Sequence, residues 1–174
     1  RSGETTDALQ LLLTDDPSEA LFLARKLDQT NQERREEDQR TFDEALELLE
    51  RDHDLSREMG VVLSCDGWHP GVLGIVATRI VEKIQRPVLV IALDGERGRG
   101  SGRSIAGFNL FEALTECSES LIRFCGHEQA AGMAVAREAL PDLREAFNIA
   151  ANQRFSMDEL HSALFVHLAI RLAS

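Results

Sequence analysis

The sequence predicts an α/β domain in which a mixed β-sheet is flanked by helices and preceded by a long connecting helix. Two observations indicate this fold class. After residue 58, apolar runs alternate with amphipathic segments, as in chains that wrap strands and helices around one sheet. The stretch 28–41 contains no apolar residue, and it has no Gly or Pro that would end a helix. We therefore expect a helical connector at 1–55, an α/β domain at 56–155 and the start of a following segment at 156–174.

The connecting helix is predicted to begin near Asp16. Asp16 can cap the helix, Pro17 suits its first turn, and Glu19 can reach back as in a capping box. A helix that is polar on all sides usually bridges two bodies through solvent. About 35 residues would span roughly 50 Å, which is long enough to connect two domains. The alternative is two shorter helices with a charged break near Glu36.

The elements of the α/β domain follow from hydrophobic periodicity. Asn109 can cap one helix, with Glu112 three residues later. Short extended segments are expected to flank a glycine-rich turn that begins at Gly98. The other expected elements are buried strands at 61–65 and 87–93, a helix at 72–84, a short strand at 133–136 and a closing helix at 141–154.

Charge, hydropathy and cysteine content limit the class of protein. The net charge is −11, but residues 1–58 carry 8 basic and 17 acidic residues, whereas 97–104 carries three arginines and no carboxylate. A local cationic site is therefore compatible with an acidic chain. No apolar run approaches the ~20 residues that cross a bilayer, so we predict a cytoplasmic protein with no membrane partner. Cys65, Cys117 and Cys125 have no CxxC spacing, which indicates incidental or buried thiols.

The run from Gly98 to Ser104 is the strongest candidate for a phosphate site. Alternating glycines allow the backbone to approach a ligand and to turn successive N–H groups toward one anion. Arg99 and Arg103 would add forked donors, and the serines would add hydroxyls. The alternative is a flexible hairpin tip with charged, solvated ends.

Two other loops carry candidate ligand groups. In the loop 67–71, Trp68 could stack on a base and His69 could donate to a phosphate, or they could serve as a core anchor and a helix cap. In the loop 126–132, small residues surround His127 and leave it as the main polar group. Taken with the glycine-arginine run, these loops favour phosphate binding.

At these three places the sequence resembles a known family, the RecJ-like bacterial exonucleases specific for single-stranded DNA. The resemblance covers roughly residues 7–155 and is to their DHH-associated domain. The Gly-His and Ala-Ala-Gly element alone also occurs in oligoribonuclease-type phosphatases and alanyl-tRNA synthetases, whereas Trp-His-Pro-Gly favours RecJ. Cys125 is a departure, because the family usually has glycine there. The matching motifs are Gly67-Trp68-His69-Pro70-Gly71, continuing to Arg79, then Gly100-Ser101-Gly102-Arg103-Ser104, and Gly126-His127-Glu128-Gln129-Ala130-Ala131-Gly132.

The resemblance implies a 5′–3′ exonuclease of DNA repair and recombination that uses manganese or magnesium. The metal would be bound by an N-terminal DHH domain absent from this chain, so no metal ligand or catalytic residue is expected here, and the chain alone is expected to be inactive. Ser101 and Arg103 would bind the terminal phosphate, and His127 would contact the scissile phosphate. The segment from Ser156 would lead to an oligonucleotide-binding (OB) domain. The remaining residues expected to bind substrate are Trp68, His69, Arg79, Gly102, Ser104 and Gly126.

The implied partner is single-stranded DNA, with a single-strand-binding protein or a helicase as further partners. Two alternatives remain open. A related phosphoesterase of very short RNAs or nucleotide bisphosphates would use a similar set of loops. A non-catalytic nucleic-acid-binding adaptor would use the domain for assembly.

Overall fold

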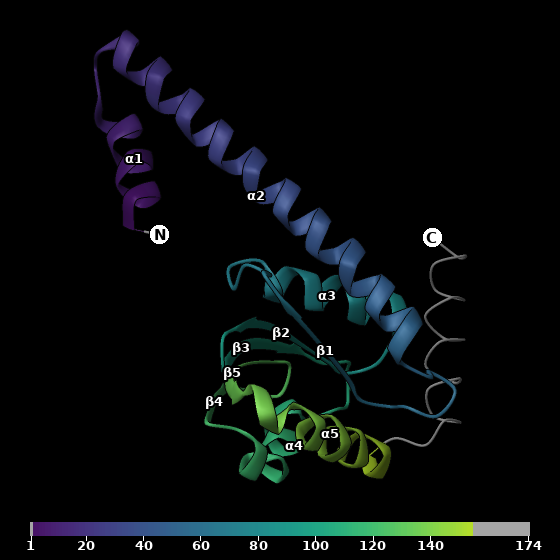
Figure 1. Ribbon diagram of the computed structural model, residues 1–174. Coiled ribbons are helices and arrows are strands. Elements are labelled where there is room, and N and C mark those ends of the chain that lie inside the picture. Colours follow the sequence, from purple (N-terminus) through teal and green to yellow (C-terminus); the bar gives the residue numbers. More distant parts are fainter. Residues whose placement is uncertain (1, 155–174) are drawn as a thin grey trace, which may run out of the picture. The chain divides into compact units, whose positions relative to one another are not determined.

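The chain folds into two units, residues 1–40 and residues 41–174, which are described separately. The computed structural model describes residues 2–154 (Figure 1). The segment predicted at 156–174 lies outside the described residues, and the predicted domain boundaries stay predictions. No helix of the described part is long and apolar enough to cross a membrane.

The first unit contains helix α1 (Ser2–Leu13) and the first part of helix α2 (Pro17–Asp52). Helix α2 is continuous, so the alternative of a break near Glu36 is wrong. Pairs one turn apart support its polar stretch; for example, Gln32 Nε2 donates to Glu36 Oε1 at 2.7 Å. The sequence therefore predicted the long helix correctly.

The start of α2 uses only part of the predicted cap. Asp16 Oδ1 accepts a hydrogen bond from the Ser18 N–H at 2.8 Å. Glu19 does not form the predicted capping box, because its carboxylate accepts from Gln10 Nε2 at 2.6 Å and from the Thr14 hydroxyl. Both donors are supplied by α1 and the turn after it, and α1 was not predicted.

The second unit is built on a five-stranded sheet with strand order β1-β2-β3-β5-β4 (Figure 1). Strands β1 and β2 are parallel, and the other neighbouring pairs are antiparallel. This arrangement confirms the predicted mixed sheet, although β4 was not predicted. The strands are β1 (Val61–Asp66), β2 (Val88–Asp94), β3 (Arg97–Arg103), β4 (Arg123–Gly126) and β5 (Ala130–Ala136).

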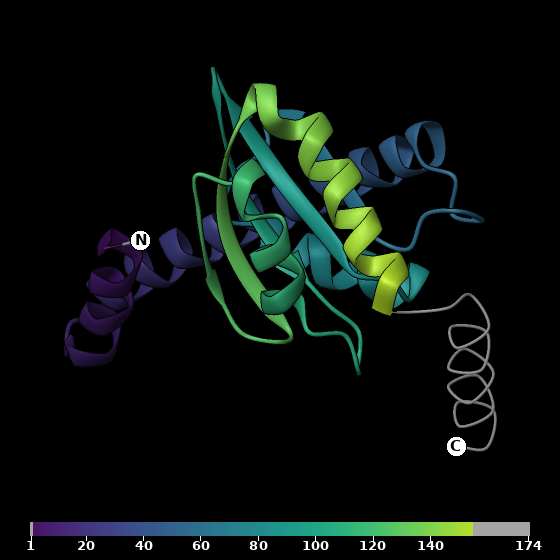
Figure 2. The same cartoon turned by 90° about the horizontal axis from the view of Figure 1, so that it is seen from below.

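Helices cover both faces of this sheet. Helix α3 (Leu73–Ile84) and the part of α2 after Arg40 pack on one face, which we call the α3 face. Helices α4 (Leu110–Glu116) and α5 (Leu140–Arg154) pack on the opposite face. Figure 2 shows α4 and α5 side by side on that second face. The predicted helices flanking the sheet are thus confirmed.

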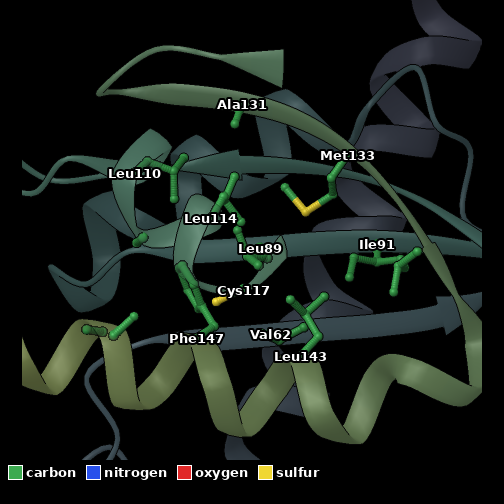
Figure 3. Close-up of a cluster of buried hydrophobic side chains, with 14 of the residues drawn as sticks. Val62, Leu89, Ile91, Leu110, Leu114, Cys117, Ala131, Met133, Leu143 and Phe147 are labelled. Carbon is green, nitrogen blue, oxygen red and sulfur yellow. The ribbon is translucent and has the colours of Figure 1, made fainter. Parts of the chain in front are cut away.

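Strand β2 contributes to the core on both faces because its side chains alternate. Val88 and Val90 pack on the α3 face, whereas Leu89 and Ile91 pack toward α4 and α5. Figure 3 shows Leu89 and Ile91 among the side chains of the α4 and α5 core, together with Met133 of β5. All four β2 side chains are fully buried, so this strand fixes the centre of the unit.

The glycine-rich run differs from its predicted conformation. It forms strand β3 rather than a turn, and it is paired along its length with β2 and β5. Its glycines face α4 and α5, where a Cβ on Gly100 would lie 2.9 Å from both Ile91 Cγ1 and Met133 Cγ. The glycines therefore make room for core side chains and do not form an anion cradle. Alternation places Arg97, Arg99, Ser101 and Arg103 on the α3 face.

We predict that Gly100→Ala destabilises the protein. The added methyl group would overpack the core against Ile91 and Met133 and lower the free energy of unfolding by about 1–3 kcal/mol. The matched control is Gly132→Ala on the neighbouring strand, where a Cβ would meet no atom within 4 Å. Urea denaturation of the two variants should separate them, and equal stability would contradict the role given to the β3 glycines.

Candidate functional site

Ser101 and Arg103 form the centre of a polar site on the α3 face. Arg103 Nη1 donates to Ser101 Oγ at 3.0 Å and to the carbonyl of Gly102 at 2.8 Å. These two bonds hold the guanidinium along its own strand, and both side chains are partly exposed. Because Ser101 Oγ accepts this hydrogen bond, its own proton is available to a ligand.

The N-terminus of α3 lies directly over this pair. A Cβ on Gly74 would come within 2.8 Å of Arg103 Nη2 and 3.4 Å of Ser101 Oγ. Helix α3 has no side-chain cap, and the N–H groups of Leu73 and Gly74 have no acceptor among residues 2–154. Uncapped N–H groups at a helix start carry partial positive charge and bind anions. A cationic guanidinium and partly positive backbone N–H groups therefore converge at one place.

The hairpin between β4 and β5 borders the same site. Arg103 is in register with Ala130, the first residue of β5, and the Ser104 N–H donates to the carbonyl of Gln129 at 3.1 Å. His127 is exposed, and its Nδ1 accepts a hydrogen bond from the Gln129 N–H at 3.3 Å. This bond places the proton of the neutral ring on Nε2, which makes His127 a donor toward solvent.

Gly126 is required by the hairpin fold. A Cβ at this position would lie 2.6 Å from Ala131 Cα and would also overlap the carbonyl oxygen of Ala130. Both neighbours are backbone atoms of the paired strand. Gly126 therefore positions His127, and this close packing alone accounts for the glycine.

The loop before α3 supplies one exposed group and one buried group. Trp68 is only 4% exposed, and its indole N–H donates to Glu44 Oε2 at 2.7 Å. Its ring packs in the α3-side core, so the core-anchor interpretation applies and the ring is not available to stack on a base. His69 is exposed, and its Nδ1 accepts from the Gly71 N–H at 3.0 Å. His69 thus holds the turn into α3 and keeps a free Nε2.

Three other predicted residues are used within the fold. The Arg79 guanidinium lies 3.7 Å from the centre of the Phe42 ring, in a cation–π contact. The Ser104 hydroxyl donates to the carbonyl of Phe108 at 2.9 Å, which closes the loop before α4. Gly102 is buried and faces the core under α4 and α5 rather than the α3 face. The structure therefore groups Ser101 and Arg103 with the start of α3 and the His127 hairpin.

Cys125 is exposed on β4, next to Gly132 in the register of the sheet. All three cysteines are free thiols, and burial raises the pKa of Cys117 to about 11. Since Cys125 is exposed, its side chain adds bulk to the α3 face at β4. Cys125 is the position named above as an expected departure from the resembling family.

Sequence reasoning missed Gly74 and Gly132, although both are glycines within quoted motifs. Gly74 matters because helix α3 crosses β3 at Arg103, and Gly132 because it is in register with Ser101. The pairing of distant strands sets both positions. The only signal in the sequence was that glycine stands in a helix and in a strand, where it is normally unfavourable.

No metal-binding cluster occurs in the part of the chain that the structure describes. Nowhere in residues 2–154 do three His, Cys, Asp or Glu side chains come together in a way that could hold a metal ion. The described residues therefore do not fit a catalytic metal centre. The polar groups around Ser101 are instead hydrogen-bond donors, namely the Arg103 guanidinium and the first N–H groups of α3.

A family model for the DHHA1 domain matches residues 58–153. Curated relatives include the "Single-stranded-DNA-specific exonuclease RecJ" of Bacillus subtilis, 40% identical over 161 residues, and that of Thermus thermophilus, 41% identical over 142 residues. These alignments cover 91% and 81% of this chain but only 20% of each relative. The chain thus spans about a fifth of the length of these relatives.

Comparison with solved structures also finds similarity to RecJ proteins. The chain is similar to RecJ from Thermus thermophilus in complex with Mg2+, with a TM-score of 0.75 and 36% identity over 88% of this chain and 23% of that one. It is also similar to "exonuclease RecJ bound to manganese", with a TM-score of 0.76 and 34% identity over 87% and 37% of the two chains. With a matching model over more than half of its length, the chain belongs to the DHHA1 domain family, and its similarity is to the RecJ members of that family.

Proposed function

We propose that this chain is the substrate-binding part of a RecJ-like 5′–3′ exonuclease that degrades single-stranded DNA in repair and recombination. The observation that carries the proposal is the placement of Gly74 of α3 over Ser101 and Arg103 of β3. This contact brings together the start of α3 and the glycine-arginine run of β3, which lie nearly thirty residues apart in the sequence. Together they form one anion site. The curated relatives are named as single-stranded-DNA-specific exonucleases, which supports DNA as the polyanion.

Each group of the site has a separate task in holding a terminal 5′-phosphate. Arg103 supplies charge and forked donors, and its bond to Ser101 Oγ fixes its orientation. Ser101 donates its hydroxyl proton to a second phosphate oxygen. The free N–H groups of Leu73 and Gly74 donate along the axis of α3, where the helix dipole favours negative charge.

His127 would contact the next phosphate, which is the one to be cleaved. Its Nδ1 is held by the Gln129 N–H, so the ring offers an Nε2–H to a phosphoryl oxygen. An N–H donor of this kind orients the phosphate and stabilises negative charge that develops on its oxygens. His127 is thus proposed to position the substrate, and no general base is assigned to it.

Hydrolysis itself would need groups outside the described residues. The related RecJ structures contain Mg2+ or manganese, and a divalent ion supplies Lewis acidity to phosphodiester cleavage. Residues 2–154 have no ligand cluster for such an ion, so their part in the reaction is to bind and orient the strand. We propose that a DHH domain holds the metal, that residues 1–55 connect to it, and that residues 156–174 lead to an OB domain.

We predict that Arg103→Ala weakens binding of a 5′-phosphorylated oligo(dT) to the chain. Loss of charge-assisted hydrogen bonds should cost about 1.5–3 kcal/mol, or roughly ten- to hundredfold in Kd. Fluorescence anisotropy is the measurement, and a 5′-hydroxyl oligo(dT) should show little difference between wild type and variant. The matched control is Arg97→Ala, an exposed arginine on the same strand and face.

Equal, negligible effects of Arg103→Ala and Arg97→Ala would contradict the assigned phosphate site. Tighter binding of 5′-phosphorylated dinucleotides than of long strands would favour the phosphoesterase of short RNAs or bisphosphates. Oligonucleotide binding by this chain, together with no nuclease activity of the full-length protein, would favour the non-catalytic nucleic-acid-binding adaptor. A cytoplasmic location and further partners, namely a single-strand-binding protein or a helicase, stay predictions.

We also predict that Gly74→Ala lowers the affinity for DNA without lowering the stability of the fold. The new Cβ would meet the end of the flexible Arg103 side chain, which can move away at little cost. Alanine is the better helix former by about 1 kcal/mol, so the melting temperature should stay the same or rise. Affinity for the 5′-phosphorylated oligo(dT) should fall several-fold. An unchanged affinity would show that the guanidinium position in this structure is not the binding position.

A further inference from the structure

Gly132 is a glycine for which the fold shows no need. It lies in the middle of β5, and a Cβ at this position would meet no atom within 4 Å. It does not have a positive φ angle. By contrast, a Cβ on Gly100 or Gly126 would overlap neighbouring atoms. A strand interior is weakened by glycine unless something approaches the backbone closely, so the open space over Gly132 suggests an external occupant.

The exposed backbone at Gly132 lies next to the proposed phosphate site at Ser101. Gly132 is in register with Ser101 on one side and with Cys125 on the other. All three lie on the α3 face, because paired residues in a sheet point to the same side. Helix α3 packs over β2 and β3, whereas Cys125 on β4 is exposed. A ligand held at Ser101 could therefore extend across β5 toward the edge of the sheet.

Two arginines lie beside this path, one row of same-face residues further along the strands. Arg99 and Arg123 are both in register with Ala134, from β3 and β4 respectively. Both are exposed, and neither side chain has a hydrogen bond or ion pair within residues 2–154. Their backbones are two strand spacings apart, or about 10 Å. Two long cationic side chains thus border a surface of small residues.

Charge favours a polyanion as the occupant. Strands β2 to β5 carry one carboxylate, Asp94, and the register places it beside Arg97 at the far end of β3 from Arg103. The surface next to Gly132 therefore has one arginine on each neighbouring strand, and strands β3 to β5 place no carboxylate there. In a chain with a net charge of −11, such a local excess of positive charge indicates a specific contact.

We propose that the sugar-phosphate backbone of single-stranded DNA crosses β5 over Gly132 and that Arg99 and Arg123 bind phosphates beyond the terminal one. This inference rests on the proposed function, since the path starts at Ser101 and Arg103. Gly132 allows the sugar-phosphate chain to lie against β5, and the two arginines, both in the row of Ala134, neutralise its charge from the adjacent strands β3 and β4. The proposed ligand is the sugar-phosphate backbone of single-stranded DNA, and its bases are not recognised.

The test compares a short and a long probe on the 174-residue chain. The short probe is a 5′-phosphorylated dinucleotide, and the long probe is a 5′-phosphorylated oligo(dT) of about a dozen nucleotides. Arg99→Ala and Arg123→Ala should each weaken the long probe by about three- to tenfold and lower the slope of log K against log salt by about 0.7. Both should leave binding of the short probe unchanged. Lys83→Ala, an exposed cation on the last turn of α3, is the matched control.

Gly132→Val adds a steric test with a separate readout. Its melting temperature should not fall, since a Cβ at this position meets no atom within 4 Å and valine is favoured in strands, but its affinity for the long probe should drop at least as much as that of either arginine variant. The proposal is overturned if the long probe binds all three variants as tightly as wild type while Arg103→Ala still weakens both probes. If Arg103→Ala affects neither probe, the proposed function itself fails.

Discussion

The site depends on the unequal faces of strand β3. This strand is third in a sheet of five, so both of its edges are paired and its side chains can point only to the two faces. On one face, Leu89, Ile91 and Met133 leave no room for side chains. Glycine at alternate positions of β3 avoids overlap with these side chains. Every polar residue of the strand consequently lies on the opposite face. Core packing thus fixes where Ser101 and Arg103 are presented.

Helix α3 completes the site because its own packing leaves its N-terminus uncapped over these residues. Buried side chains such as Val76 and Ile80 hold the helix on the sheet, so its first N–H groups cannot move away from Arg103. A preorganised group of backbone N–H donors and a guanidinium costs little reorganisation when an anion binds. This local arrangement is compatible with an acidic chain because the excess acid is concentrated in residues 1–58.

Hydrophobic periodicity was sufficient to predict β1, β2, part of β5 and the flanking helices, whereas the continuous helix α2 was predicted from the lack of Gly and Pro in 28–41. The conformation of the glycine run was not predictable in this way, because glycine is typical of turns and the side chains that require it in β3 belong to other strands. Trp68 was ambiguous for a similar reason, since its partner Glu44 lies 24 residues away. Ser101, Arg103 and His127 could be chosen from their residue types, whereas Gly74 and Gly132 become meaningful only once helix crossing and strand register are known.

The most direct test of the account is to map the bound 5′-phosphate by NMR on the nitrogen-15-labelled chain. Titration with 5′-phosphorylated and 5′-hydroxyl oligo(dT) should give amide shift differences centred on Leu73, Gly74 and Ser101, with the Arg103 side chain affected as well. These differences should be specific to the phosphorylated strand, because the donors of α3 and β3 converge on the terminal phosphate. Identical shifts with both strands, or shifts centred on the α4 and α5 face, would contradict the claim that this crossing of helix and strand is the phosphate site.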